Sequence, residues 1–250
     1  MEYALFNYCL WLGDNSLILG HRLSEWTGHG PILEEDIAMT NIGLDLVGQA
    51  SSLLTLAGDI EGEERSEDDL AYKRDVKEFK NTLLVEQVNG DFGRTMMRQY
   101  LFDVFHFHLM QALSDSKDER LKAIASKSLK EITYHKRHSR EWIKRLGDGT
   151  EESHARMQNA LNELWMFSDD LFVSCDGDQE LEDKGIIPNL DNIKSQWDSE
   201  VKALLKEASL TIPEEVFMMK GSRKGIHTEH LGYLLAEMQF LPRAYPDAKW

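Results

Sequence analysis

Proline is scarce in this chain of 250 residues: there are five prolines, and none lies between Pro31 and Pro188. An interior proline removes a backbone hydrogen bond and destabilises a helix by about 3 kcal/mol, so this long gap permits long helices. Strand signals are also missing, because no segment shows sustained alternation rich in Val, Ile and Thr. These two absences predict an all-α protein.

Cysteines, cations and long apolar runs are also few. Cys9 and Cys175 are the only cysteines and neither belongs to a CxxC motif, so we expect a reducing, cytoplasmic setting. No apolar run approaches the roughly 18–20 residues of a membrane span, and the first residues do not resemble a secretory signal. The formal net charge of −16 disfavours contact with a phosphate backbone, so we expect no nucleic-acid partner.

Apolar periodicity and the glycine and proline breakers predict eight helices. Their approximate ranges are 3–27, 34–56, 68–86, 92–113, 117–146, 151–173, 190–208 and 228–240. Long helices joined by short connections are typical of an antiparallel bundle, and the helix at 92–113, apolar nearly all round, should be central. We expect a single domain over residues 1–250, with a core bundle at about 3–174 and a C-terminal extension with extra helices at about 175–250.

Four chemistry-bearing residues lie on predicted inward faces of four different helices. They are Glu25, Asp45, Asp103 and His135. Burying a carboxylate is unfavourable unless it is paired, hydrogen-bonded or bound to metal. One such group from each of four helices is the geometry of the carboxylate-bridged di-iron proteins, so the pattern predicts a ferritin-like bundle.

The predicted metal centre is incomplete. A working di-iron site of this type needs a Glu-x-x-His pair on each of two helices, because that step places both ligands on one helix face. Here the two steps read Asp45-x-x-Gly48 and Ile132-x-x-His135, so one has lost its imidazole and the other its carboxylate. We predict a vestigial site with no metal or cofactor of its own. A metal-free polar network is favoured over partial metal occupancy.

A basic segment near the C-terminus suggests a second site. Its residues are Lys220, Arg223, Lys224, His227 and His230. With the glycines that surround them, they could cradle an anion near an interface with a partner, or form an ordered loop that packs against the bundle. A metal site at the His-x-x-His step is disfavoured, because no cysteine or further histidine accompanies it.

Two other polar features have structural explanations. His106 and His108 flank Phe107 on different helix faces, and we expect them to be hydrogen-bonded structural residues. A cationic run on the helix at 117–146 is expected to be a solvated face with ion pairs one helical turn apart. A docking surface for a partner is the alternative.

Four segments of the chain resemble one family closely. They are 12–15 (LGDN), 41–50 (NIGLDLVGQA), 84–92 (LVEQVNGDF) and 224–232 (KGIHTEHLG). In this order they resemble the structural subunit of the ring-1,2-phenylacetyl-CoA epoxidases, which are bacterial multicomponent oxygenases, and the resemblance covers essentially the whole chain.

The resemblance implies a ferritin-like fold related to the catalytic di-iron subunit, with which this chain would pair as a scaffold. In that family the partner binds the iron and the coenzyme A thioester, and the complex inserts one oxygen atom from O2 into the aromatic ring. A reductase supplies electrons, and it and the small accessory subunits would be indirect partners. Alone, the chain could form a homodimer. The alternatives are a stand-alone di-metal carboxylate oxidase or oxygenase with an atypical ligand set, and a ferritin-like binding module without an oxygenase partner.

Overall fold

The computed structural model describes residues 1–246 and 248, and within them it contains helices and no strand. The α-helices are α1 (Glu2–Ser24), α2 (Leu33–Glu61), α3 (Glu67–Tyr72), α4 (Phe92–Leu113), α5 (Glu119–Gly147), α6 (Glu151–Leu164), α7 (Asp178–Asp183), α8 (Leu190–Glu207), α9 (Glu229–Met238) and α10 (Phe240–Ala244). Short 3-10 helices cover Val76–Glu78, Trp165–Phe172 and Ser222–Lys224. The predicted all-α, ferritin-like bundle is confirmed.

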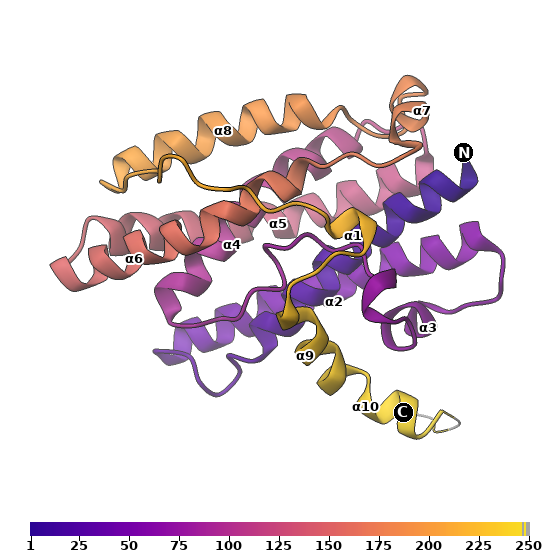
Figure 1. Ribbon diagram of the computed structural model, residues 1–250, viewed down its shortest axis with the longest axis horizontal. Helices are drawn as coiled ribbons and strands as arrows, with labels where there is room; N and C mark the ends of the chain where they lie inside the picture. The colour runs from indigo at the N-terminus through magenta and orange to yellow at the C-terminus, as the bar shows by residue number, and fades with distance from the viewer. Residues whose placement is uncertain (247, 249–250) are drawn as a thin grey trace.

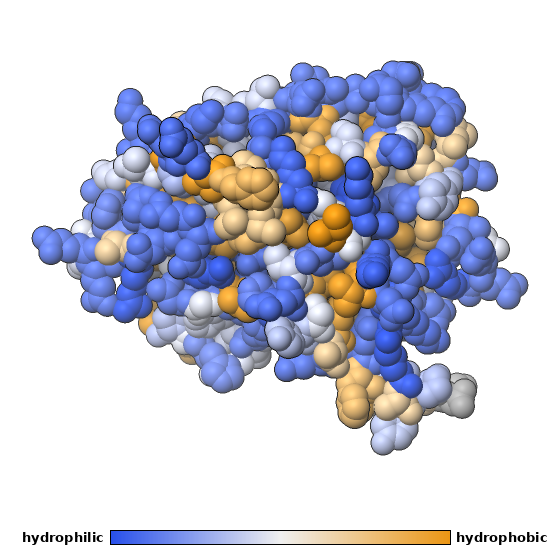
Figure 2. Space-filling model, viewed as in Figure 1, coloured by the Kyte–Doolittle hydropathy of each residue, from blue (hydrophilic) through white to orange (hydrophobic). Residues whose placement is uncertain are grey.

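The core of the bundle consists of two helix pairs, α1 with α2 and α4 with α5. Each pair is joined by a short connection, so its helices run antiparallel. Helices α6 and α8 pack on the second pair, and α9 and α10 form an arm that projects from the body (Figure 1). Apolar surface gathers on this arm (Figure 2). No helix of the described residues has the length and apolar character needed to cross a membrane.

Helices α1 and α4 are buried on nearly all sides, which confirms the central place predicted for residues 92–113. Close packing between α1 and α2 depends on glycine. A Cβ atom built on Gly20 would lie 3.1 Å from the backbone oxygen of Gly43, which is tighter than ordinary contact. The two helix backbones therefore approach each other closely at this crossing.

The predicted helix at 68–86 is wrong. Helix α3 ends at Tyr72, a 3-10 turn covers Val76–Glu78, and an irregular segment continues to the start of α4. The reason is tertiary, because side chains from elsewhere capture the backbone N–H groups that a helix would use. Lys80 donates its backbone N–H to Asp14, and Thr82 donates its own to Asn15. The prediction for 151–173 is also too long as an α-helix, since α6 gives way to 3-10 geometry at Trp165.

Candidate functional site

Three of the four residues predicted for the vestigial site come together between α2, α4 and α5. On α4, the carboxylate of Asp103 is fully buried and accepts hydrogen bonds from Gln99 Nε2 at 2.8 Å and Ser139 Oγ at 2.7 Å. On α5, the buried ring of His135 places its Nε2 atom 3.0 Å from Asp45 Oδ2 of α2. The side chain of Asp45 is 38% exposed, so this cluster reaches from the core to the surface.

The buried part of this cluster favours neutral groups. Burial raises the pKa of Asp103 to about 6, although His135 and the hydrogen bonds from Ser139 and Gln99 act in the opposite direction. Burial also lowers the pKa of His106 to about 3, with a smaller contribution from His135. The Nδ1 atom of His106 has no hydrogen-bond partner, and its ring packs on Phe102 with the ring centroids 5.0 Å apart. His106 is therefore held neutral among apolar groups.

The fourth residue is misplaced in the prediction: Glu25 does not face the bundle interior. Helix α1 ends at Ser24, and Glu25 is its C-cap residue, with a side chain that is 45% exposed. Its carboxylate accepts hydrogen bonds from Arg22 Nη1 at 2.7 Å and from Asn89 Nδ2 at 2.9 Å. Position 25 therefore lies at the exposed end of α1, where its carboxylate is held by Arg22 and Asn89.

The two positions at which ligands were predicted to be lost have different surroundings. Gly48 is exposed, with no atom within 4 Å of the place of a Cβ, whereas Ile132 is fully buried in the core. Only the second position faces the interior that a bridged centre would occupy. Replacing the glycine by histidine would therefore leave the site incomplete.

The residues at this site do not fit a carboxylate-bridged di-iron centre. Asp103 is engaged with Gln99 and Ser139, and the Nε2 atom of His135 is engaged with Asp45. Within residues 1–246 and 248, no group of three or more His, Cys, Asp or Glu side chains is placed to hold a metal ion. The arrangement is a hydrogen-bonded polar network across three helices.

A second polar cluster, which the sequence interpretation missed, fixes the irregular segment 79–90 onto α1. We call it the polar latch; its members are Asp14, Asn15, Arg74, Thr82, Glu86, Asp170, His227 and Thr228. The fully buried carboxylate of Asp14 accepts from the guanidinium of Arg74 and from the backbone of Lys80. Asn15 Oδ1 accepts from the backbone N–H and the hydroxyl of Thr82 at 2.8 and 2.9 Å.

The other half of the polar latch joins this segment to the C-terminal part of the chain. Glu86 Oε1 accepts from the backbone N–H and the hydroxyl of Thr228 at 2.6 and 2.7 Å. The ring of His227 has Nδ1 at 2.9 Å from Glu86 Oε2 and Nε2 at 3.0 Å from the carbonyl of Phe79. Both ring nitrogens face acceptors, as in an imidazolium that donates twice. Burial disfavours that charge, but the contacts with Glu86 outweigh it, and the pKa of His227 is raised.

The basic segment at 220–230 is also drawn into the protein. Arg223 is buried, donates to Asp178 Oδ2 at 3.1 Å and lies over the ring of Trp11 at 4.4 Å. Lys220 Nζ lies 3.0 Å from Asp169 Oδ2. Lys224 is exposed.

His230 contributes its backbone carbonyl, which accepts from Arg22 Nη2 at 3.1 Å. With Arg223 and Lys220 facing carboxylates, and both ring nitrogens of His227 engaged, the segment packs against the bundle. This arrangement favours the packing alternative over an anion cradle or a metal site.

Three cations of α5, Lys136, Arg140 and Lys144, pair with α8. Lys136 Nζ lies 2.9 Å from Glu200 Oε1, and Lys144 Nζ lies 2.7 Å from Glu207 Oε1. His108 joins the same cluster, with its Nε2 atom 2.9 Å from Glu200 Oε2, so its expected structural role is supported. Helix α8 therefore pairs with part of the cationic run.

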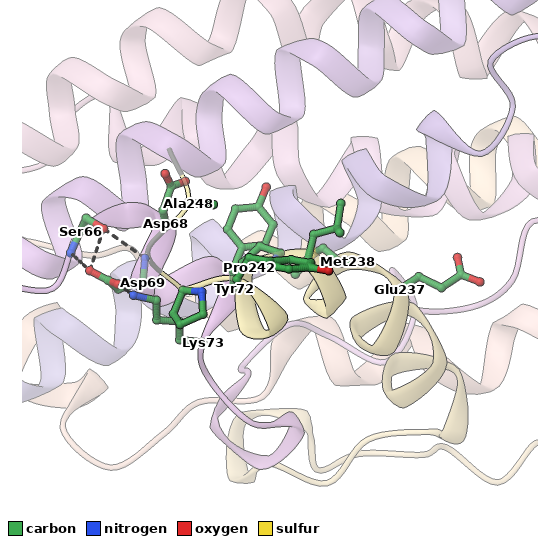
Figure 3. Close-up of a pocket in the computed structure, with 12 residues that line it drawn as sticks. Ser66, Asp68, Asp69, Tyr72, Lys73, Glu237, Met238, Pro242 and Ala248 are labelled. Atoms are coloured by element: carbon green, nitrogen blue, oxygen red, sulfur yellow. Dashed lines mark hydrogen bonds and ion pairs between the residues drawn. The ribbon is translucent and has the colours of Figure 1, made fainter. Parts of the chain in front are cut away.

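A pocket of about 570 Å³ lies between α3 and the arm of α9 and α10 (Figure 3). Its polar side chains serve their own helix: Ser66 and Asp69 cap the start of α3, and Asp69 pairs with Lys73. A smaller groove of about 320 Å³ runs between α2 and α5, where Asp45 and Gly48 line it. The residues that line these two hollows do not form a recognisable catalytic arrangement.

Comparison with known proteins gives one consistent result. The phenylacetic acid catabolic protein family matches residues 1–250. The chain is also similar to one component, designated C, of the 1,2-phenylacetyl-CoA epoxidase of Escherichia coli (strain K12). The identity is 48% over 243 residues, which cover 97% of this chain and 98% of that protein.

Proposed function

Because this chain belongs to the phenylacetic acid catabolic protein family, we propose that it is a non-catalytic scaffold subunit of a 1,2-phenylacetyl-CoA epoxidase in aerobic phenylacetate breakdown. It pairs with a separate subunit that carries the di-iron centre and binds the thioester. The reductase and the small accessory subunits act on that partner, and the complex works in the cytoplasm.

The donor set of the vestigial site is the observation that carries the non-catalytic role. A di-iron centre of the bundle type takes its ligands from four helices. In this chain, Glu25 lies at the surface, Gly48 and Ile132 supply no donor, and the remaining carboxylates are engaged within the protein. Iron chemistry is therefore assigned to the partner, and the role of this chain is to present a fixed shape.

The rigid part of that shape is built from two sets of polar contacts inside the bundle. The network around Asp103 and His135 ties α2, α4 and α5 together. The polar latch fixes the segment 79–90 and the C-terminal loop on α1. Buried polar groups that are hydrogen-bonded across elements in this way restrict a fold to one arrangement, which is what a docking partner requires. Three atoms of these sets, Gln99 Oε1, His135 Nδ1 and Asn15 Nδ2, have no hydrogen-bond partner among the described residues.

The test is co-expression with the iron-carrying subunit from the same pathway, followed by size-exclusion chromatography and iron determination on each chain. We expect the two chains to co-elute, the isolated chain to hold far less than one iron, and ring epoxidation to require both chains. Two irons per isolated chain, with oxygen consumption that His135→Ala abolishes, would establish the stand-alone oxidase instead. A chain that remains separate from the partner would indicate a binding module of another kind.

A further inference from the structure

The groove between α2 and α5 is crossed by two polar contacts that lie one helical turn apart. Asp45 of α2 faces His135 of α5, with Oδ2 and Nε2 separated by 3.0 Å. One turn further along, Gln49 Nε2 donates to Glu131 Oε2 at 2.9 Å. Residues one turn apart on a helix have Cβ atoms about 5–6 Å apart. The carboxylates of Asp45 and Glu131, which both line the groove, therefore occupy neighbouring positions along it.

Each of these two carboxylates uses one oxygen within the protein and keeps the other available. Within residues 1–246 and 248, Asp45 Oδ1 and Glu131 Oε1 accept no hydrogen bond, and no lysine or arginine pairs with either carboxylate. The side chain of Asp45 is 38% exposed. Because a carboxylate can accept about four hydrogen bonds, the groove holds acceptor capacity that the described residues leave unused.

Gln49 adds a third acceptor. This residue is only 3% exposed and lines the groove. A carboxylate accepts but does not donate, so the amide nitrogen of Gln49 must face Glu131, and this fixes the position of the amide oxygen. That oxygen, Oε1, is buried and has no hydrogen-bond partner in the described part of the chain. Since an unpaired buried acceptor is unfavourable, its position indicates a donor from outside the chain.

The rest of the groove suits a hydrocarbon stem. Leu44, Gly48, Ala123 and Ile124 line it beside the three acceptors, and its volume is about 320 Å³. Leu44 is 64% exposed, so it offers apolar surface at the rim. A long cationic side chain lays its methylene stem on apolar surface and carries its donors at the tip. The groove therefore has the chemistry of a receptor for a lysine or arginine side chain.

The charges of the groove select arginine. Its charged lining residues are Asp45, Glu131 and Lys127, which leaves one net negative charge for a monovalent group to balance. A divalent metal fits less well, because no set of three or more His, Cys, Asp or Glu side chains is gathered for one among the described residues. The planar guanidinium has five donors, reaches separate acceptors at once and is less strongly hydrated than an ammonium.

We propose that the groove between α2 and α5 receives an arginine side chain of the iron-carrying subunit. This inference rests on the proposed function. The guanidinium donates to the second oxygens of Asp45 and Glu131 and to Gln49 Oε1, while its stem lies on Leu44 and Ile124. Charge-assisted hydrogen bonds to acceptors on two helices give such a contact a fixed geometry. It would therefore set the register of the two subunits as well as add affinity.

Three conservative variants test the groove. Glu131→Gln removes the charge and keeps the shape, and its amide oxygen can still accept from Gln49. The matched control is Glu141→Gln, another partly exposed carboxylate of α5 that does not line the groove. Lys127→Met removes the one cation of the lining and keeps an apolar stem. Circular dichroism and thermal unfolding verify that each full-length variant is folded.

The first measurement is the dissociation constant of each variant with the iron-carrying subunit, by isothermal titration calorimetry. We expect Glu131→Gln to weaken binding at least about tenfold, because it removes the charge from a hydrogen-bonded pair at an interface. Lys127→Met should strengthen binding about threefold, since a like charge is removed, and Glu141→Gln should stay within about twofold of the wild type.

The second measurement uses the isolated chain and a small probe, Nα-acetyl-arginine methylamide. Nuclear magnetic resonance of the isotope-labelled chain follows the side-chain amide of Gln49 during the titration. We expect saturable binding with a dissociation constant on the order of 1 mM. The corresponding citrulline compound, which has nearly the same shape and no charge, should bind at least about tenfold more weakly, and Glu131→Gln should weaken binding of the arginine probe by a similar factor.

Each contrary outcome identifies a different error. A wild-type complex whose affinity Glu131→Gln leaves unchanged would overturn the arginine contact and leave the proposed function intact. Equal binding of the arginine and citrulline probes would also overturn it. Binding of Mn²⁺ to the isolated chain, abolished by Glu131→Gln in electron paramagnetic resonance, would make a metal ion the occupant instead.

Two outcomes concern the partner. A wild-type homodimer in sedimentation that Glu131→Gln dissociates would make a second copy of the chain the source of the arginine and overturn the assignment. Absence of a wild-type complex would overturn the proposed function and the partner named here. The probe titration distinguishes that result from a failure of the groove itself, because it needs no partner.

Discussion

Replacing Asp103 by asparagine should stabilise this protein at neutral pH. The carboxyl is fully buried, and its pKa in the folded state is about 6, against an ordinary value of 3.8. A difference of about two pKa units corresponds to about 3 kcal/mol. Because the folded state binds the proton more tightly, the free energy of unfolding falls as the pH rises from about 4 to about 6, and it stays lower above that.

Asparagine fits the hydrogen bonds of this position. Its Oδ1 atom can accept from Gln99 Nε2, as the carboxylate does at 2.8 Å. Its amide can donate to the hydroxyl oxygen of Ser139, whose own proton has the His135 carbonyl as an alternative acceptor at 3.1 Å. The variant therefore removes the buried charge while retaining two hydrogen bonds, so the gain approaches about 3 kcal/mol above pH 6.

The assay is urea unfolding of the wild type and the variant between pH 4 and pH 8, monitored by circular dichroism. We expect nearly equal stability near pH 4 and a gap that widens to between about 1 and 3 kcal/mol by pH 8, since local rearrangement reduces the full value. A variant that is less stable than the wild type at pH 8, or a gap that does not change with pH, would refute the reasoning. Ser139→Ala, which keeps the carboxyl and removes a donor, should shift stability in the opposite direction at pH 8.

Three further predictions concern the latch and the helix crossing. Asp14→Ala should lower the free energy of unfolding by about 3–5 kcal/mol in urea titrations, because it leaves the buried guanidinium of Arg74 uncompensated; a loss below about 1 kcal/mol would contradict this. The raised pKa of His227 makes the latch strongest below about pH 6.5 and weaker as the pH rises through the pKa of the folded state. Hydrogen exchange of residues 224–232, corrected for intrinsic rates, should therefore accelerate at high pH in the wild type. The same rates should change less with pH in Glu86→Gln. Gly20→Val should destabilise by about 1–3 kcal/mol in thermal unfolding, because its first added carbon already meets an opposing carbonyl; an unchanged midpoint would show that the crossing tolerates bulk.

Sequence periodicity predicted the long helices well because the apolar pattern that specifies each helix lies within that helix. The range 92–113 is reproduced by α4, whose buried residues surround the helix axis. The helix predicted for 68–86 was wrong because the structure of this segment is decided by groups far away in the chain. Among them are Asp14 and Asp170, which accept hydrogen bonds from its backbone. Periodicity within a window has no access to such partners.

The part of the candidate site that could be predicted is the part that depends on the spacing of residues within one helix. Asp45, Asp103 and His135 were placed near one centre because each lies mid-helix on an identifiable face. Glu25 was misplaced because the end of α1 was set about three residues too late, and boundaries depend on caps rather than on periodicity. The latch did leave a signal, since Asp14 and Asn15 interrupt an otherwise apolar stretch of α1, and buried polar groups require partners.

The latch has a consequence for how the chain is made. Helix α1 emerges early and is mostly apolar at its buried positions, yet the contacts that close over it include His227 and Thr228, about 200 residues later. At the usual 5–20 residues per second, roughly 10–40 s pass between the synthesis of α1 and the synthesis of these last contacting residues. During that interval the part of α1 that α2 does not cover stays exposed, so the yield in the cell should depend on chaperones that bind the first part of the chain.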